Sequence, residues 1–431
     1  MAGEWKRTSL REAGVTLIDC DHRTPPAADS GYPYVAIPQI KEGRLALADA
    51  RRISPEHFAD WTRKAKPQHH DVILSRRCNP GESAFVPAGL ECALGQNLVL
   101  LRSDGTKIFP PFLRWLLHGP DWWEQVETFI NVGAIFNSLK CADIPNFKMP
   151  LPPLAEQKAI AAVLGALDDK IELNRRMNAT LEAMVRALFQ SWFADFDPVR
   201  AKLYGRKPAS LDGATAVLFP DSFQDSEAGR IPKSWIVGKV SDIATLNRGA
   251  VNPGEFPTET FDHYSLPAFD NGRTPKVELG RAIMSNKFAV TPNSVLLSKL
   301  NPHIPRIWLP DLNASRRSVC STEFMVACAK GGVSREYLFS LFTSSAFTSV
   351  YGTLVTGTTG SHQRIRPESV LDMQIVIPTP ALICAFTDVA KPMFDQINRN
   401  TEQSRTLATL RDTLLPKLLS GELSPNFSQN S

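Results

Sequence analysis

Two long segments of the chain carry apolar residues that recur in steps of four and three. Each segment follows a proline, and Gly421 marks a stop after the second. This spacing predicts two long helices, at about 153–194 and from about 380 to 419, that pack along a shared seam. We favour antiparallel packing, because short loops cannot join the helices as a parallel pair. The seam positions are Ile160, Leu164, Leu167, Ile171, Asn174, Asn178, Leu181, Val185, Leu188 and Trp192 in the first helix, and Phe386, Ala390, Met393, Ile397, Asn400, Ser404, Leu407, Arg411, Leu414 and Leu418 in the second.

Polar residues interrupt this seam. Asn174 and Asn400 hold matching positions, and a polar seam residue lowers stability while fixing register. The alternative is that both amides face solvent at the edge of the seam. Arg411 breaks the second stripe, and we expect Leu410 to take the core position there. Pro392 predicts a kink near the start of the second helix.

The segments before each long helix have a mixed pattern. VILS (72–75) and NLVLL (97–101) are short apolar runs bounded by turn residues, which indicates strands. The stretch 111–129 has helical spacing interrupted at Gly119-Pro120. We therefore expect an α+β fold.

The chain repeats this plan once. Trp5 and Tyr34 match Trp235 and Tyr264 at an offset of 230 residues, and the segment at Ile144 matches the segment at 370 at an offset of 226. A series of weak matches in order, at nearly constant offset, indicates a duplicated domain. We expect two mixed domains in pseudo-twofold arrangement, separated by two long antiparallel helices that form a coiled coil. The expected parts are a first domain at 1–152, a first helix at 153–195, a connector at 196–233, a second domain at 234–378, a second helix at 379–421 and a tail at 422–431.

Composition narrows the class of protein. The chain has 431 residues, of which 43% are hydrophobic and 21% are charged, so long disorder is not expected. We find no apolar run of membrane-spanning length and no secretory signal, and seven cysteines are an odd number for a disulfide framework. These features favour a cytoplasmic protein. A net charge of +4 permits nucleic-acid binding without requiring it.

Common catalytic motifs do not occur in the sequence. HExxH, CxxC, GxGxxG, GxSxG and a complete Walker A loop are all missing. We therefore expect no catalytic residues, no metal site and no directly bound cofactor.

Basic and amide side chains gather at corresponding places in the two mixed domains. Arg and Lys suit guanine edges and phosphates, Asn and Gln suit adenine, and Ser suits phosphate. Each residue taken alone is equally consistent with a solvated loop, but the recurrence in both copies favours DNA binding. The candidates are Arg76, Arg77, Asn79, Asn137, Ser138 and Lys140 in the first copy, and Lys299, Asn301, His303, Arg306, Arg316, Arg317, Ser361, His362, Gln363, Arg364 and Arg366 in the second.

Several motifs resemble one known family. The run IPNFKMPLPPLAEQKAI, the following long helix and SWFADFDPVRAK are similar to the central shared region of Type I restriction–modification specificity subunits. GTTGSHQRI, MQIVIPTP and LRDTLLPKLLSGEL resemble the distal copy of that pattern. The chain departs from the family at Leu382-Ile383, where a Glu-Gln pair is usual, which puts a local contact of the second helix in doubt.

The resemblance implies a specific role. Such subunits have two target-recognition domains in inverted orientation, each reading one half of a split, asymmetric target in double-stranded DNA, and they carry no catalytic centre. The helices recruit two methyltransferase subunits, which use S-adenosylmethionine, and restriction–translocase subunits in the full complex use ATP and Mg²⁺. Two alternatives remain at this point. One is an enzyme that methylates or cuts DNA alone, and the other is a duplicated protein-binding adaptor without DNA contact.

Overall fold

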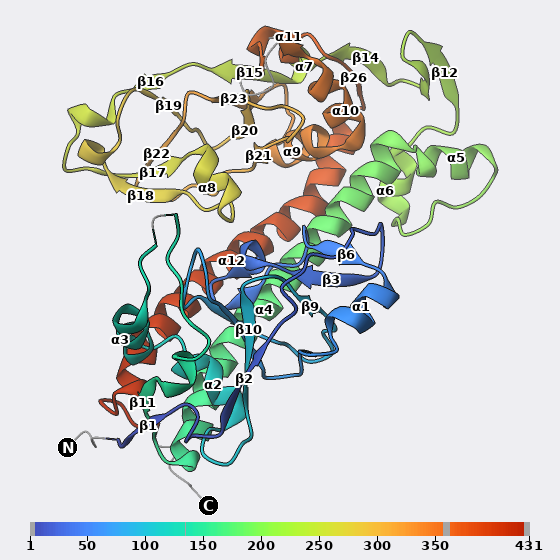
Figure 1. Cartoon of the computed structure of the whole chain (residues 1–431). Coiled ribbons are helices and arrows are strands. Elements are labelled where there is room, and N and C mark those ends of the chain that lie inside the picture. The colour runs from blue at the N-terminus through green and yellow to red at the C-terminus, as the bar shows by residue number, and fades with distance from the viewer. Residues whose placement is uncertain (1–4, 134, 357–362, 426–431) are drawn as a thin grey trace, which may run out of the picture. The chain divides into compact units, whose positions relative to one another are not determined.

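The short apolar runs near the N-terminus form antiparallel strands. In the computed structural model, which describes residues 5–133, 135–356 and 363–425, they build a four-stranded sheet of order β2-β10-β7-β8 (Figure 1). Every pairing in this sheet is antiparallel. The strands are β2 (Val15–Asp19), β7 (Val72–Ser75), β8 (Ser83–Phe85) and β10 (Leu98–Ser103).

The central strand β7 is buried on both faces, which explains its continuous apolar run. Val72 and Leu74 face a core built with helices, whereas Ile73 faces a second core beneath a three-stranded sheet of order β6-β3-β9. The remaining elements before the long helix are β1 (Arg7–Ser9), β3 (Tyr32–Val35), β4 (Ile40–Lys41), β5 (Arg44–Leu45), β6 (Arg51–Ile53), α1 (Pro55–Trp61), β9 (Ala93–Leu94), α2 (Pro110–Leu116), α3 (Pro120–Phe129) and β11 (Lys148–Pro150). The predicted interruption at Gly119-Pro120 is confirmed, since α2 ends before it and α3 begins at Pro120.

A second four-stranded sheet repeats the first. Its order is β15-β23-β20-β21, again with antiparallel pairings. The central strand β20 also faces two cores, with Val295 and Leu297 on one side and Leu296 on the other. The strands are β15 (Ala244–Asn247), β20 (Ser294–Ser298), β21 (Ile307–Trp308) and β23 (Phe324–Ala329).

The predicted repeat is confirmed in detail. Tyr34 pairs with Ala93 in a parallel contact between β3 and β9, and Tyr264 pairs with Cys320 in a parallel contact between β17 and β22. The second copy extends this sheet to five strands, in the order β16-β19-β22-β17-β18. These strands are β16 (Ala250–Val251), β17 (Thr260–Tyr264), β18 (Lys276–Leu279), β19 (Lys287–Ala289) and β22 (Arg317–Cys320).

Short elements complete the second copy. The segment 196–233, expected as irregular, contains two short helices and a hairpin, and Val199 and Phe219 are buried in the same core as β20. The elements are α5 (Asp197–Leu203), α6 (Gly213–Leu218), β12 (Phe223–Ser226), β13 (Gly229–Pro232), β14 (Ile236–Lys239), α7 (Val240–Ile243), α8 (Leu266–Asp270), α9 (Arg335–Thr343), α10 (Ser345–Thr353), β24 (Val355–Thr356), β25 (Arg364–Ile365), α11 (Pro367–Leu371) and β26 (Gln374–Ile377).

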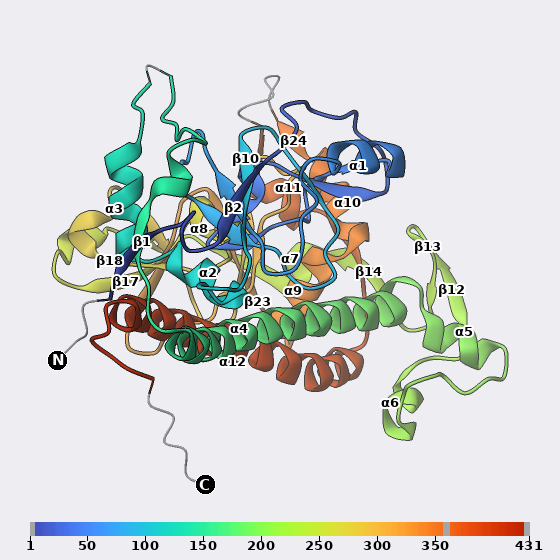
Figure 2. The same ribbon diagram turned by 60° about the horizontal axis from the view of Figure 1, so that its bottom comes forward.

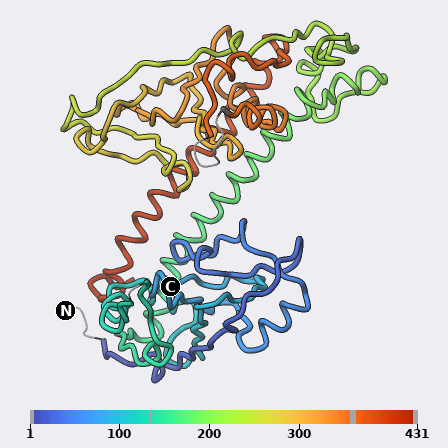
Figure 3. The backbone as a smooth tube through the Cα atoms, turned by 45° about the horizontal axis from the view of Figure 1, so that its top comes forward, coloured from blue at the N-terminus to red at the C-terminus, as the bar shows by residue number. Residues whose placement is uncertain are grey.

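The two long helices are α4 (Leu154–Phe189), which continues into a π-helical turn at Gln190–Ala194, and α12 (Pro380–Leu419). They run as the green and red coils of Figures 2 and 3. The chain forms two compact units, residues 1–173 with 403–431, and residues 174–402, so each helix contributes one part to each unit. Helix α12 is unbroken through Pro392, and it ends two residues before Gly421, whose φ of +74° suits glycine.

The helices are antiparallel, as expected. In the first unit, the start of α4 (Ile160, Leu164) shares a core with the end of α12 (Leu418). In the second unit, the end of α4 (Val185) shares a core with the start of α12 (Phe386). The seam positions Ile171, Trp192 and Ala390 are also buried. The half-buried seam positions are Leu167, Leu181, Leu188, Met393, Ile397, Leu407 and Leu414.

The polar seam residues lie inside the helix pair. Asn174 is 0% exposed and Asn400 is 4% exposed, so they do not face solvent at a seam edge. The Asn174 amide donates to the Asn400 carbonyl (3.3 Å), and the Asn400 amide donates to Asn178 Oδ1 (2.8 Å). These bonds tie one turn of α4 to one turn of α12, which is how a buried amide selects a register.

The expectation for Leu410 is wrong. Its side chain is 44% exposed, while Arg411 turns inward and forms an ion pair with Asp168 at 2.9 Å. The hydrophobic pattern could not show this, because the partner carboxylate lies 243 residues away in the sequence.

Candidate nucleic-acid interface

The candidate residues of the first copy meet where strand β7 ends. The Leu139 amide donates to the Arg76 carbonyl (2.8 Å), and Arg77 forms a β-bridge with Ser138. Asn131 and Ser138 exchange two backbone hydrogen bonds of 2.8 and 3.0 Å, which closes a hairpin. The structure therefore brings two segments, separated by about 60 residues in the sequence, to one place.

The hairpin carries the other candidates. Asn137 and Lys140 are exposed on it, Ser138 is half-buried at its base, and Asn79 is exposed in the turn after Arg77. The Arg77 guanidinium lies over the Phe136 ring, 5.3 Å from its centroid. A guanidinium on an aromatic face is held in place while its donors stay available.

The second copy repeats this junction after strand β20. The Ile365 amide donates to the Lys299 carbonyl (3.0 Å), and Leu300 forms a β-bridge with Arg364. The Asn301 amide donates to the Gln363 carbonyl (3.0 Å). The junction of Lys299 with Ile365 thus corresponds to the junction of Arg76 with Leu139.

Not all candidates of the second copy belong to this junction. Arg316 is paired with the buried Asp262 at 2.8 Å, and Arg317 makes two bonds of 2.6 Å to Glu259. Arg306 makes bonds of 2.7 and 2.9 Å to Asp270, and its side chain is 14% exposed. These three arginines form ion pairs that connect segments of the second domain. They lie near the junction residues in the sequence, but their guanidinium groups are already engaged by carboxylates.

The remaining candidates are placed as follows. Arg364 donates to Glu323 (2.8 Å), while Arg366 and His303 are exposed. Ser361 and His362 lie outside the described residues, so the second junction is described from Gln363 onward.

Comparisons with known proteins agree on one family. A sequence profile for the Type I restriction modification DNA specificity domain matches residues 22–183. The HindI specificity subunit of Haemophilus influenzae is 23% identical over 82% of this chain and 86% of its own length. The MjaIX specificity subunit of Methanocaldococcus jannaschii is 26% identical over 82% of this chain and 77% of its own length.

Residues 22–183 are thus similar to the Type I restriction modification DNA specificity domain, and most of the chain is similar to Type I specificity subunits. A crystal structure of the S subunit from M. genitalium has the same fold, with a TM-score of 0.52 and 14% identity over 96% of both chains. The expected α+β class is therefore confirmed. Both relatives are named as specificity subunits of Type I restriction enzymes.

Sequence reasoning missed an ionic cluster in the first unit. Asp168 on α4 is 2% exposed and is contacted by three arginines, namely Arg44, Arg114 and Arg411. Burial alone would raise the pKa of the Asp168 carboxyl, but the charges and hydrogen bonds of Arg114 and Arg44 lower it to about 2. The cluster joins α2 and the β4–β5 hairpin to both long helices. The one sign of this cluster in the sequence was the position of Asp168, which directly follows the seam residue Leu167.

A comparison of the two copies also explains why Leu382-Ile383 replaces the Glu-Gln pair that is usual at the start of the second helix. In the first copy, buried Gln157 accepts from the Phe109 amide and donates to the Lys107 and Pro152 carbonyls, each at 2.8 Å. Its counterpart Ile383 is 3% exposed and lies in the apolar core of the second unit. In the second copy, apolar packing of Ile383 therefore replaces the hydrogen bonds that Gln157 makes in the first.

Side chains that could bind a metal meet at one place among the described residues, at Asp19, Cys20 and His22. Burial raises the pKa of the Cys20 thiol to about 11, and its Sγ already donates to the Gly95 carbonyl (3.1 Å). A protonated thiol is a poor metal ligand, because metals bind the thiolate. We therefore assign no metal site here.

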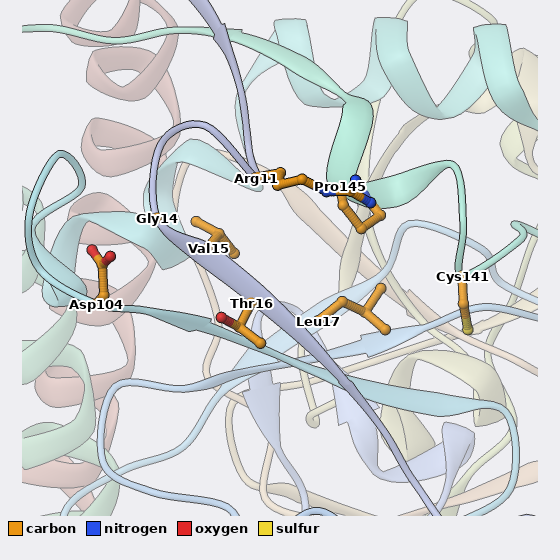
Figure 4. Close-up of a pocket in the computed structure, with 8 residues that line it drawn as sticks. All are labelled: Arg11, Gly14, Val15, Thr16, Leu17, Asp104, Cys141 and Pro145. Carbon is orange, nitrogen blue, oxygen red and sulfur yellow. The ribbon is translucent and has the colours of Figure 1, made fainter.

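A pocket of about 520 Å³ lies beside strand β2 (Figure 4). Its charged side chains are Arg11 and Asp104, and Asp104 Oδ1 already accepts from the Thr106 amide (2.8 Å) and hydroxyl (2.7 Å). The other lining residues are Gly14, Val15, Thr16, Leu17, Cys141 and Pro145. Such a lining offers a shallow polar hollow near Lys140 and gives no basis for a catalytic role. The helices of the described residues include none long and apolar enough to cross a membrane.

Proposed function

We propose that this chain is a Type I specificity subunit and that it reads a split, asymmetric target in double-stranded DNA, with one half read by each junction. The observation that carries the proposal is the repeated backbone link, Leu139 to Arg76 and Ile365 to Lys299. In each copy this link presents cationic and amide side chains at the end of a rigid, doubly buried strand. Because the two junctions differ in sequence, the two half-sites should differ as well.

The long helices supply the second part of the proposal. They hold two reading domains in pseudo-twofold arrangement and recruit two methyltransferase subunits, with restriction–translocase subunits in the full complex. S-adenosylmethionine, ATP and Mg²⁺ are used by those partners, and this chain binds none of them directly. The expected domain boundaries, from 1–152 to 422–431, and a cytoplasmic location belong to the same proposal. All seven cysteines are free thiols, which supports a reducing compartment.

Two measurements test the proposal. Mapping of adenine methylation in the host genome, with and without the gene, should reveal one split motif that depends on this chain. The affinity of the purified complex for that motif should fall steeply between 50 and 200 mM salt, by about a thousandfold or more if six or more phosphates are contacted. Salt-independent binding would favour an adaptor without DNA contact, and methylation or cleavage by this chain alone would show an enzyme.

A further inference from the structure

The hairpin of the first junction ends in exposed apolar side chains. Val132 is 83% exposed and Ile135 is 89% exposed. The hairpin extends beyond α3 as a narrow finger (Figure 2). Exposed large apolar side chains that lie close together indicate an interaction site, where a binding partner covers them.

The base of the hairpin is firmly fixed. Leu139 is 1% exposed in the core of the first unit, and Phe129, just before the hairpin, stacks on Phe147 at 5.0 Å. A Cβ atom on Gly133 would lie 2.5 Å from the Phe136 carbonyl oxygen, so glycine is required for the turn. The apolar residues are therefore carried by a hairpin whose base is anchored in the core of the first unit.

The surroundings of the tip are suited to a polyanion. Residues 131–140 include no acidic side chain, and neither do residues 76–80 of the facing segment. Arg77 and Lys140 supply positive charge, with Asn137 beside the tip. Exposed apolar side chains on a hairpin that also presents cationic and amide side chains match the chemistry of duplex DNA, whose phosphates surround stacked bases.

We propose that the 131–138 hairpin inserts Ile135 and Val132 between base pairs of the half-site read by the first domain. This inference rests on the proposed function, since it needs a duplex at the first junction. Apolar wedges of this kind unstack a base step and kink the duplex. Arg77, held on the Phe136 ring, and Lys140 would then bind the adjoining phosphates or base edges.

The proposal makes the two half-sites unequal. The corresponding segment of the second copy, residues 357–363, has the sequence GTTGSHQ and contains no large apolar residue. Insertion should therefore deform the half-site of the first domain and leave the other half-site stacked. The sequence preference of the first half should then include an easily unstacked step such as TA or CA.

The test uses the full chain in complex with its methyltransferase subunits. The adenine analogue 2-aminopurine, which fluoresces when unstacked, is placed in turn in both half-sites, away from the methylated adenine. The double variant Val132→Ser with Ile135→Ser is compared with Val217→Ser, a control at a valine that is 77% exposed on α6. Fluorescence should rise at one step of one half-site. The double variant should lose this rise and bind about five- to tenfold more weakly, whereas the control should behave as the native protein.

Other results would overturn the inference. Sequence-specific binding by the native complex without unstacking in either half-site would exclude insertion while leaving the proposed function intact. If the double variant bound DNA normally but no longer assembled with methyltransferase subunits, the tip would be a protein contact. Binding by the native complex without any sequence preference would remove the proposed function and, with it, this inference.

Discussion

At the scale of single residues, the partner of an arginine decides what it does. Arg317 and Arg77 both lie over a phenyl ring, at 3.9 Å from the Phe256 centroid and 5.3 Å from the Phe136 centroid. Two bonds to Glu259 engage the Arg317 donors, whereas the ring contact leaves the in-plane donors of Arg77 available. Both arginines are adjacent to short apolar runs, so the sequence alone does not show which of them has free donors for a ligand. We therefore propose that the DNA-contacting residues are those at the two junctions.

Replacement of Arg77 by alanine tests this distinction. If Arg77 contacts a base, Arg77→Ala should weaken binding of the target by roughly 1–3 kcal/mol and relax one position of it. Titration of DNA variants by fluorescence anisotropy measures both effects. Arg63→Ala is a matched control, because Arg63 is 73% exposed and pairs only with Asp60 three residues away. Equal behaviour of Arg77→Ala and Arg63→Ala would remove Arg77 from the interface.

Asp168 should control the stability of the first unit. Asp168→Asn leaves three arginines without their shared carboxylate, which should lower the free energy of unfolding by about 3 kcal/mol. Because the folded pKa is below the unfolded value, this contribution is complete above about pH 4 and is lost as pH falls toward 2. Urea unfolding at several pH values measures it. The adjacent, exposed Asp169→Asn is the control and should change stability little; an equal loss in both variants would contradict this role.

At the scale of elements, much of the architecture could be predicted. The seam positions and the break at Gly119-Pro120 follow from the spacing of apolar residues, because helix periodicity depends on residues that are close together in the sequence. The junctions could be suggested only as groups of residue types, since the link from Leu139 to Arg76 joins distant segments. The ion pair of Arg411 with Asp168 was missed for the same reason, as was the tip formed by Val132 and Ile135.

The buried amides should matter for register more than for stability. Asn178→Leu removes the Oδ1 acceptor of the Asn400 side-chain amide, and Asn400→Leu removes the donor to Asn178 Oδ1. Each change should lower the free energy of unfolding by about 1–3 kcal/mol. The double variant should recover most of that loss, because both partners become apolar. Chemical unfolding gives the four values of the cycle. Additive losses would show that the Asn178–Asn400 bond contributes nothing of its own.

At the scale of the whole molecule, the long helices should set the distance between half-sites. Seven residues added to each helix at matching levels preserve the seam pattern and lengthen the pair by about 10.5 Å, at 1.5 Å per residue. The methylated motif should then gain about three base pairs in its central spacer, at 3.4 Å each. Methylation mapping reads the new motif directly. Four residues added near Asn174 in α4 alone should disrupt the seam and abolish recognition, and an unchanged motif in either variant would contradict a spacer role.

The end of α12 has a consequence for how the protein folds during translation. Leu418 and Leu419 complete the core of the first unit, although they are synthesised after all of residues 174–402. Residues 174–402 form a contiguous unit, whereas residues 1–173 wait for residues 403–419. At about 5–20 residues per second, the ribosome needs about 12–50 s to travel from residue 174 to residue 419. We therefore expect the second unit to complete its fold before the first, although residues 1–173 are synthesised earlier.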